Sequence, residues 1–254
     1  MPDTMAHLMD HVFPDSGRFA TLKQNAIGED VIGTRRGRIL CDSQEATMSE
    51  SVWPTIHAER QALADDLADL TPEQWATPTM CPDWNVHQVL AHQLTAATMT
   101  PPKFLLKIAA AGFDFTKYAA KEVAADSAGG PTATLAMFRA AIPRTTAPPG
   151  PKETWLGEVF VHGEDIRRAL GMTGDYPLPQ VIRAIGLYAR SNVIIGGKTR
   201  VDGLTLKATD IQYSVGSGPV VEGPAISLLL AASGRHSAID ELSGPGVETL
   251  RARR

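Results

Sequence analysis

The sequence predicts an α+β protein, with a helix bundle over residues 48–196 and a small α/β domain over residues 197–254. In the first part, apolar residues recur at intervals of three and four, as they do along the buried face of a helix. After Gly196-Gly197 the pattern changes, because Leu204–Thr209 and Ile211–Val215 alternate with the period of a β-strand. This change of period places the domain boundary at about residue 196.

The first predicted helix begins near Ser51. Five apolar residues recur there at nearly helical spacing: Val52, Ile56, Leu63, Leu67 and Leu70. Thr71-Pro72-Glu73 then has the composition of a helix start, with an N-cap threonine, a proline at the first helical position and an acidic first turn. We therefore expect a short helix through Trp75.

The next helix is expected over about Val86–Met99, after a loop at Cys81–Asn85 that supplies capping residues. One face of this helix is predicted to carry Val86, Val89, Leu90, Gln93 and Ala97. Pro101-Pro102 is expected to end it, because proline cannot continue a helix from within. A further helix is predicted over residues 103–122.

Four more helices are predicted further along the chain. They cover about residues 132–142, 152–170, 178–194 and 225–232. Glycine- and proline-rich breaks separate them, among them Gly129-Gly130-Pro131 and Pro148-Pro149-Gly150-Pro151. Gly171 is expected to stop the helix at 152–170. Residues 247–252 are interpreted as a last strand.

Residues 1–47 differ from the rest of the chain, because they show no sustained helical or alternating period. Met48 then opens Met-Ser-Glu-Ser-Val-Trp, which has the form of a natural start. We therefore interpret residues 1–47 as a disordered arm or as a non-native extension from an early start codon. A genuine but divergent extension is the alternative.

Composition excludes several classes of protein. The 254 residues have a formal net charge of −4 and a pI near 6.0, without clustered lysine and arginine, so no nucleic-acid partner is expected. No apolar stretch reaches the length of a membrane span, and the N-terminus lacks a signal-peptide pattern. The two cysteines, Cys41 and Cys81, are too few for a disulfide scaffold. The sequence fits a cytoplasmic protein, either a monomer or a homodimer.

The clearest chemistry lies in the helix at 152–170. Glu158 and His162 are four residues apart, so they lie one turn apart on the same helix face. The inward arc of this helix is expected to comprise Trp155, Val159, Ile166 and Ala169. The solvent side is expected to comprise Glu164, Arg167 and Arg168. Glu158 and His162 flank the inward arc, and a carboxylate near a buried face needs a partner such as a metal ion.

His92, at the edge of the apolar face of the helix at 86–99, supplies a third candidate ligand. Two histidines and a glutamate from two packed helices leave room for water or substrate, which is the pattern of a catalytic zinc site. The same ligand set also holds Fe(II), Ni or Mn. Asp165, three residues after His162, can orient the histidine ring. The alternative is that Glu158 and His162 are solvated helix residues and His92 is a hydrogen-bonded structural histidine.

Several motifs carry a family resemblance. In the bundle they are Thr71-Pro-Glu-Gln-Trp, Cys81-Pro-Asp-Trp-Asn-Val, Val-Leu-Ala-His92 and Glu158-Val-Phe-Val-His162-Gly-Glu-Asp165-Ile-Arg. Beyond it they are Ala208-Thr-Asp210-Ile-Gln-Tyr-Ser-Val-Gly, Gly223-Pro-Ala, Gly234-Arg235 and Leu242-Ser-Gly-Pro-Gly. In this order they resemble the mycothiol-dependent maleylpyruvate isomerase family of actinobacteria, one of the DinB-like metal-binding four-helix bundles. The resemblance covers roughly residues 50–254 and does not cover 1–47.

The resemblance implies a DinB-like four-helix bundle followed by a small α/β C-terminal domain. It implies that His92, Glu158 and His162 are the ligands of a divalent metal, with zinc expected. It also implies that an arginine of the C-terminal domain reaches the active site. Arg235 is the matching candidate for that catalytic role, and a surface charge at a helix end is the alternative. The thiol cofactor that the family uses is mycothiol, a cysteinyl pseudodisaccharide.

We therefore expect a metal-dependent enzyme that uses mycothiol for S-transfer or isomerisation of a small electrophilic substrate that bears a carboxylate. A thiol on a metal ionises at neutral pH, and Arg235 would neutralise the substrate carboxylate or a developing enolate. Cys81 is expected to be structural. The alternative is a non-catalytic, metal-binding DinB-like stress or binding protein, since fold does not fix function. A transcription regulator is disfavoured, because no helix-turn-helix with a basic recognition helix is found.

Overall fold

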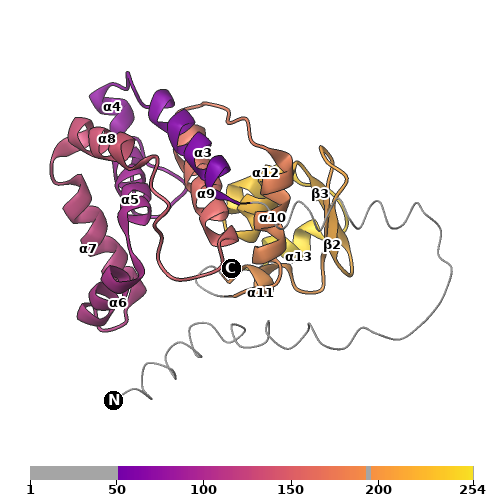
Figure 1. Cartoon of the computed structure of the whole chain (residues 1–254). Helices are drawn as coiled ribbons and strands as arrows, with labels where there is room; N and C mark the ends of the chain where they lie inside the picture. Colours follow the sequence, from indigo (N-terminus) through magenta and orange to yellow (C-terminus); the bar gives the residue numbers. More distant parts are fainter. Residues whose placement is uncertain (1–50, 193–195, 254) are drawn as a thin grey trace, which may run out of the picture. The chain divides into compact units, whose positions relative to one another are not determined.

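The computed structural model describes residues 51–192 and 196–253 (Figure 1). They belong to one compact unit that begins at Ser51. The domain boundary expected near residue 196 is not tested by this division and stays a prediction. The proposals for residues 1–47, and Cys41 with them, lie outside the described residues. No helix in the described part of the chain is long and apolar enough to cross a membrane.

The first part of the described chain is helical, as predicted. Its helices are α3 (Trp53–Asp66), α4 (Pro72–Trp75), α5 (Val86–Thr98), α6 (Pro101–Ala110), α7 (Phe115–Ser127), α8 (Gly130–Ala141), α9 (Glu153–Ala169) and α10 (Leu178–Tyr188). Four of them form a bundle, because α3 and α5 each pack against both α8 and α9. α7 packs as a further helix against α5, and α10 packs against α9.

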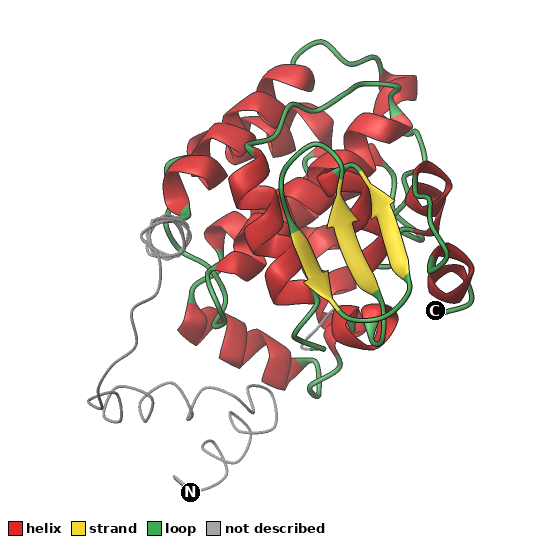
Figure 2. Cartoon of the chain, turned by 90° about the vertical axis from the view of Figure 1, so that its right-hand side faces the viewer, coloured by secondary structure: helices red, strands yellow, loops and turns green. Residues whose placement is uncertain are grey.

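The last part of the described chain contains a small sheet. Its elements are α11 (Gly197–Val201), β1 (Thr205–Ala208), β2 (Ser214–Gly216), β3 (Val220–Gly223), α12 (Ala225–Ala232), the 3₁₀ helix η2 (His236–Glu241) and α13 (Val247–Arg251). The strand order is β2-β1-β3, with β1 antiparallel to β2 and parallel to β3. Figure 2 shows the sheet against the helices, and α12 packs on β1 and β3. The α+β class predicted from the sequence is confirmed.

Two glycines let the chain pass from β2 to β3 across the start of β1. Gly216 and Gly218 have φ angles of +93° and +124°, which residues with a side chain rarely adopt. A Cβ on Gly218 would also lie 2.1 Å from the carbonyl oxygen of Gly203. Only glycine can therefore occupy these positions where the chain crosses the start of β1. The crossing places β3 next to β1, on the edge opposite β2.

Several local predictions are confirmed by their hydrogen bonds. The Thr71 side chain accepts from the backbone N–H of Gln74, and the Gln74 side chain accepts from the N–H of Thr71, which closes a capping box at α4. Asn85 and Gln88 form the same reciprocal cap at the start of α5. Such caps lie within four residues of sequence, so composition alone reveals them.

Two predicted helices are wrong or shifted. The single helix over 103–122 is two helices, because Gly112 and Phe113 adopt φ angles of +71° and +62° and reverse the chain between them. α5 ends at Thr98, before Pro101 and Pro102 as expected, but these prolines also stand in the first turn of α6, where proline is well tolerated. The helix at 178–194 ends at Tyr188, since Ser191 and Asn192 are not helical.

The C-terminal strand assignment is also wrong. Residues 247–251 form α13, and its buried residues Val247 and Leu250 are three apart, which is a helical spacing. β3 was not predicted at all, because the short segment Val220–Gly223 follows two glycines and is too brief to show an alternating pattern.

The helix α9 is buried on nearly every side. Its residue Ile166 belongs to one apolar cluster with α3, α5 and α8, while Trp155, Leu156 and Phe160 belong to another with α10 and α12. The predicted solvent side is therefore wrong: Glu164 and Arg167 are only 5% and 3% exposed, and Arg168 is partly buried. A helix between two cores has no fully polar face, so its charged residues must find partners inside the protein.

Candidate metal centre

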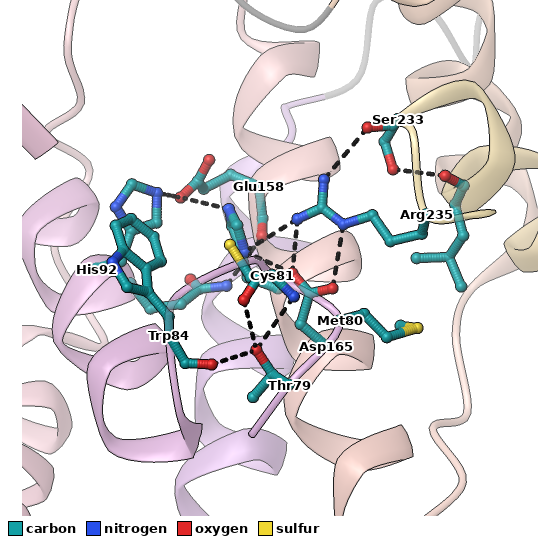
Figure 3. Close-up of polar contacts among 12 residues, drawn as sticks. Thr79, Met80, Cys81, Trp84, His92, Glu158, Asp165, Ser233 and Arg235 are labelled. Carbon is teal, nitrogen blue, oxygen red and sulfur yellow. Dashed lines mark hydrogen bonds and ion pairs between the residues drawn. The ribbon is translucent and has the colours of Figure 1, made fainter. Parts of the chain in front are cut away.

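The candidate site lies where α5 packs against α9. His92 projects from α5 and Glu158 from α9 (Figure 3). His162 follows Glu158 by one turn of α9. The side chain of Gln93, the residue after His92, donates a hydrogen bond of 2.9 Å to the backbone carbonyl of Glu158. This bond fixes how α5 and α9 are aligned along their length, so the three predicted ligands meet at the same level of the bundle.

The three candidate ligand atoms converge. His92 Nε2 lies 2.9 Å and His162 Nε2 lies 3.8 Å from Glu158 Oε1, and one ligand atom from each residue lies within 4.8 Å of the others. The two imidazole rings stand nearly perpendicular, with their centroids 4.8 Å apart. Tetrahedral zinc with bonds of about 2.0–2.1 Å holds its ligand atoms roughly 3.3 Å apart. Small side-chain movements would bring the three atoms to that spacing.

Asp165 and Arg235 support His162 from the other side. Asp165 Oδ2 accepts a hydrogen bond of 2.8 Å from His162 Nδ1, which favours the tautomer whose Nε2 faces Glu158 with a free lone pair. Arg235 donates from Nε and Nη2 to the two oxygens of Asp165, at 3.1 Å and 2.6 Å. Burial would raise the pKa of Asp165, but these two partners lower it to about 2. Asp165 therefore stays ionised and holds the ring.

The loop before α5 covers His92. Trp84 lies against the His92 ring, with the two ring centroids 4.9 Å apart. The Thr79 hydroxyl donates to the backbone carbonyl of Trp84 at 2.9 Å, and it accepts from the backbone N–H of Cys81 at 3.1 Å. These bonds order the loop at 79–84 and leave the side chain of His92 only 16% exposed.

Glu158 carries the strongest indication that the cluster binds a cation. Burial would raise its pKa, but the charges of His92, His162 and Arg235 and the contact with His92 outweigh that and bring the pKa down to about 2. Its Oε1 atom is buried, and the polar atoms nearest to it are two imidazole nitrogens, His92 Nε2 at 2.9 Å and His162 Nε2 at 3.8 Å. A buried carboxylate oxygen is costly unless such groups or a metal ion stabilise its charge. The chemistry of this donor set, two imidazole nitrogens and a carboxylate oxygen, fits zinc and similar divalent metals.

A second set of potential ligands shares His162. Cys81, His162 and Asp165 also place one ligand atom each within 4.8 Å of the others. Asp165, however, is already occupied by His162 and Arg235. Burial and nearby carboxylates raise the pKa of the free thiol of Cys81 to about 12, so it stays protonated. Of the two sets, His92, Glu158 and His162 form the better metal site.

Arg235, which the family resemblance named as the matching arginine of the C-terminal part, lies beside the cluster. Its guanidinium lies 3.5 Å from His162 Nδ1, and Nη1 donates to the backbone carbonyl of Ser233 at 3.3 Å. Its side chain is 15% exposed, and the ion pair with Asp165 keeps its pKa above the usual value although burial works against it. Arg235 is therefore a partly buried partner of Asp165.

A cavity of about 710 Å³ lies on the side of α9 that carries Glu164 and Arg168. Its lining also includes Thr79 and Met80, which precede Cys81, and Ser237, which follows Arg235 by two residues, but none of the three candidate ligands. Ser237 Oγ lies 3.0 Å from Met80 Sδ, so the loop at 79–84 and η2 meet beside the cluster. This space is large enough to hold a small organic molecule.

The sequence indicated five site residues but not three further residues that contact or influence them. The five are His92, Glu158, His162, Asp165 and Arg235. Trp84 occurs in a motif quoted for the family resemblance, yet its contact with His92 could not be read from that motif. Gln93 was assigned to the buried face of its helix, and a buried amide beside a candidate ligand is a signal that it bonds across an interface. The third is Arg60, which is buried. Burial lowers its pKa to about 10, while the charge of Glu158 acts in the opposite direction. The hydrophobic pattern of the sequence did not indicate this interaction.

Comparison with known proteins agrees with this description. Residues 56–167 match the family model described as the mycothiol maleylpyruvate isomerase N-terminal domain. Two solved structures, of the mycothiol-dependent maleylpyruvate isomerase and of a histidine-to-alanine mutant of it, share the fold at TM-scores of 0.53 and 0.54. Each is 16% identical, over 80% of this chain and 92% of that chain. No curated protein matches the chain.

The matched region spans the bundle helices from α3 to α9 and includes every predicted metal ligand. The solved structures show that the similarity in fold continues into the C-terminal part. The helical region that holds His92, Glu158 and His162 therefore belongs to the family of mycothiol maleylpyruvate isomerase N-terminal domains.

Proposed function

We propose that the protein is a metal-dependent enzyme that uses mycothiol to isomerise, or to transfer sulfur to, a small electrophile that bears a carboxylate. The observation that carries this proposal is the convergence of the buried Oε1 of Glu158 with two imidazole nitrogens, with one ligand atom from each residue within 4.8 Å of the others. The family match and the names of the two similar structures support mycothiol as the thiol and isomerisation as the reaction type.

Each residue of the cluster has a role in this proposal. His92, Glu158 and His162 would hold the metal, and Asp165 keeps the Nε2 lone pair of His162 directed toward it. Arg235 holds Asp165 ionised and in place through two hydrogen bonds. Trp84 restricts the movement of His92. When bound, a divalent metal there would supply Lewis-acid chemistry that lowers the pKa of a thiol.

Cys81, the cysteine among the described residues, does not take the thiol's part. Its pKa is raised to about 12, so its thiolate is scarce at neutral pH, which favours a nucleophile from outside the described residues. The cavity of about 710 Å³ beside the loop at 79–84 offers room for the remainder of a thiol compound larger than cysteine. Both observations favour an external thiol such as mycothiol.

Metal content tests the first step of the proposal. Elemental analysis of the purified protein should find about one divalent metal ion per chain. His92→Ala should lose most of that metal, because two protein ligands remain where catalytic zinc sites have three. His57→Ala is the matched control, since His57 lies on α3, where its Nε2 is 3.2 Å from the backbone carbonyl of Arg144, and should leave the metal content unchanged.

Calorimetric titration with mycothiol tests the second step. We expect mycothiol to bind the metal-loaded protein and not the protein stripped by a chelator. If the metal content responds to His92→Ala but mycothiol never binds, the proposed enzyme is rejected in favour of a metal-binding protein without thiol chemistry. If His92→Ala retains the metal, the site itself is assigned to the wrong residues.

A further inference from the structure

Tyr188, the last residue of α10, places its hydroxyl against α9 beside the metal cluster. A Cβ on Gly157 would lie 2.1 Å from Tyr188 Oη, which is far inside contact distance. The hydroxyl therefore occupies the space that a side chain at position 157 would fill, one residue from Glu158. Only glycine at this position lets the phenol approach the helix so closely.

The Tyr188 hydroxyl makes no hydrogen bond with another described residue. The residue is 4% exposed, but its hydroxyl oxygen is not one of the fully buried, unpartnered atoms of the described residues, so it keeps some contact with solvent. A hydroxyl that bonds to water can give that hydrogen bond to a ligand instead. By contrast, the buried phenol of Tyr176 bonds within the protein to Arg167 and Glu164.

The surroundings of this hydroxyl are those of the cluster. After burial, the charges that act most on Tyr188 are those of Glu158, Arg235 and Asp165. Burial and the two carboxylates raise its pKa, so the phenol is neutral and carries its proton at physiological pH. Tyr188 thus presents a hydrogen-bond donor, while Arg235 already gives two of its nitrogens to Asp165 and a third to Ser233.

We propose that the Tyr188 hydroxyl donates a hydrogen bond to a carboxylate or carbonyl oxygen of the small-molecule substrate held at this cluster. The inference rests on the proposed function and assigns the recognition of a substrate oxygen to Tyr188, since Arg235 is committed to Asp165. Gly157 has a complementary role, because it keeps open the space that the phenol uses.

The test measures the affinity of maleate, a small dicarboxylate probe, for the metal-loaded protein by calorimetry. Tyr188→Phe should weaken maleate binding about tenfold, as expected for one lost hydrogen bond to a charged group, with metal content and melting temperature kept. Tyr213→Phe is the matched control, since this partly buried phenol feels the charge of Arg190 and none of the cluster's charges. It should leave the maleate affinity unchanged.

A second variant covers the case in which Tyr188→Phe fails to fold. 3-Fluorotyrosine at position 188 keeps the ring and the hydroxyl but makes the hydroxyl a stronger donor, so maleate should bind at least twofold more tightly. Equal affinities in wild type and either variant, or no maleate binding by the wild type, would overturn the role of Tyr188. Maleate binding that depends on Tyr188 in a protein that never binds mycothiol would uphold the inference and reject the proposed function.

Discussion

Two regions of α9 differ in the partners of their charged side chains. Around Arg167 the groups are paired within the protein: Arg167 donates to Asp66 at 2.7 Å and to Tyr176 at 2.8 Å, and Tyr176 donates to Glu164 at 2.7 Å. Around Glu158 the partners are instead two imidazole nitrogens, which lie 2.9 Å and 3.8 Å from Oε1 and can themselves bind a metal ion.

The difference indicates that the charged groups around Arg167 stabilise the fold, whereas those around Glu158 are available to bind a ligand. Both regions lie on one helix, and each contains partly exposed side chains, so exposure alone does not distinguish them. What distinguishes them is the kind of partner, because arginine completes the hydrogen bonding in one and potential metal ligands face the carboxylate in the other. We call the groups around Arg167 the closed network, comprising Asp66, Glu164, Arg167 and Tyr176, and we expect it to act on stability, whereas the cluster at Glu158 should act on metal binding.

The largest effect is expected from breaking the closed network. Arg167→Ala removes its cation and the hydrogen bonds that it donates to the partly exposed carboxylate of Asp66 and to the hydroxyl of Tyr176, which keeps Glu164 as a partner. Hydrogen bonds to charged groups contribute about 1.5–3 kcal/mol each, so the free energy of unfolding from urea titration should fall by at least about 3 kcal/mol. The variant should still bind metal, because no candidate ligand contacts Arg167 in the ion pairs described.

Arg251 provides the control for Arg167. It is an exposed arginine on α13 that pairs with Asp240 at 2.8 Å. Surface pairs of this kind contribute little, so Arg251→Ala should leave the unfolding transition where it is. If both arginine variants lose the same stability, the closed network has no special structural role and the contrast with the cluster disappears.

The second prediction concerns the gain in unfolding free energy on metal binding, which should depend on the cluster at Glu158 and not on the closed network. With free zinc at about 100 times its dissociation constant, the wild type should gain about 2.7 kcal/mol of unfolding free energy over the chelator-treated protein. Glu158→Gln should lose most of this gain, because it replaces the anionic ligand with a neutral amide. The gain is measured as the difference between urea titrations with zinc and with chelator.

Glu164→Gln is the matched change in the closed network, on the same helix and of the same chemistry. It should lower stability both with and without zinc, since Glu164 accepts hydrogen bonds from Tyr176 and Arg168, and keep the zinc-dependent gain. A zinc-dependent gain that survives Glu158→Gln and disappears in Glu164→Gln would reverse the assignment of the two regions.

Features that depend on residues close in the sequence were predicted correctly. Features that depend on packing between segments far apart in the sequence were not. The helix starts at Thr71 and Asn85 and the Glu158–His162 pair each follow from residues within a few positions, and they are confirmed as local structure. The convergence of His92 with that pair needed the family resemblance, because their sequence separation says nothing about packing.

The burial of α9 shows why the rest could not be predicted. A helical wheel places Glu164 and Arg167 opposite the apolar arc, and such residues are normally solvated. Here α3 and residues 175–176 close over that side and bring Asp66 and Tyr176 to it. Tyr188 is a similar case, because its approach to Gly157 depends on how α10 packs on α9. These are tertiary contacts that no period in the sequence records.

The smallest effect concerns Glu59, the remaining carboxyl near Arg167. Burial raises its pKa to about 7, although Arg167, 3.8 Å away, acts to lower it. The folded state therefore binds a proton that the unfolded state has released above pH 4.5, so the contribution of Glu59 to stability falls as the pH rises from about 4.5 to 7. Above pH 7 the charged carboxylate remains a net cost.

Glu59→Gln removes this titration and keeps the shape of the side chain. At pH 8 the variant should be more stable than the wild type by about 1–2 kcal/mol, and near pH 4.5 the two should be equal. Urea titrations across this range measure the difference, and Glu248→Gln, on the exposed side of α13, should follow the wild-type curve. A variant less stable than the wild type at pH 8 would mean that Glu59 is an ionised partner of Arg167 and belongs to the closed network. In that case Glu59, like Asp66 and Glu164, would be a carboxylate that is paired within the closed network. Glu158 would then differ from all three, because it is the carboxylate that we propose binds an external cation.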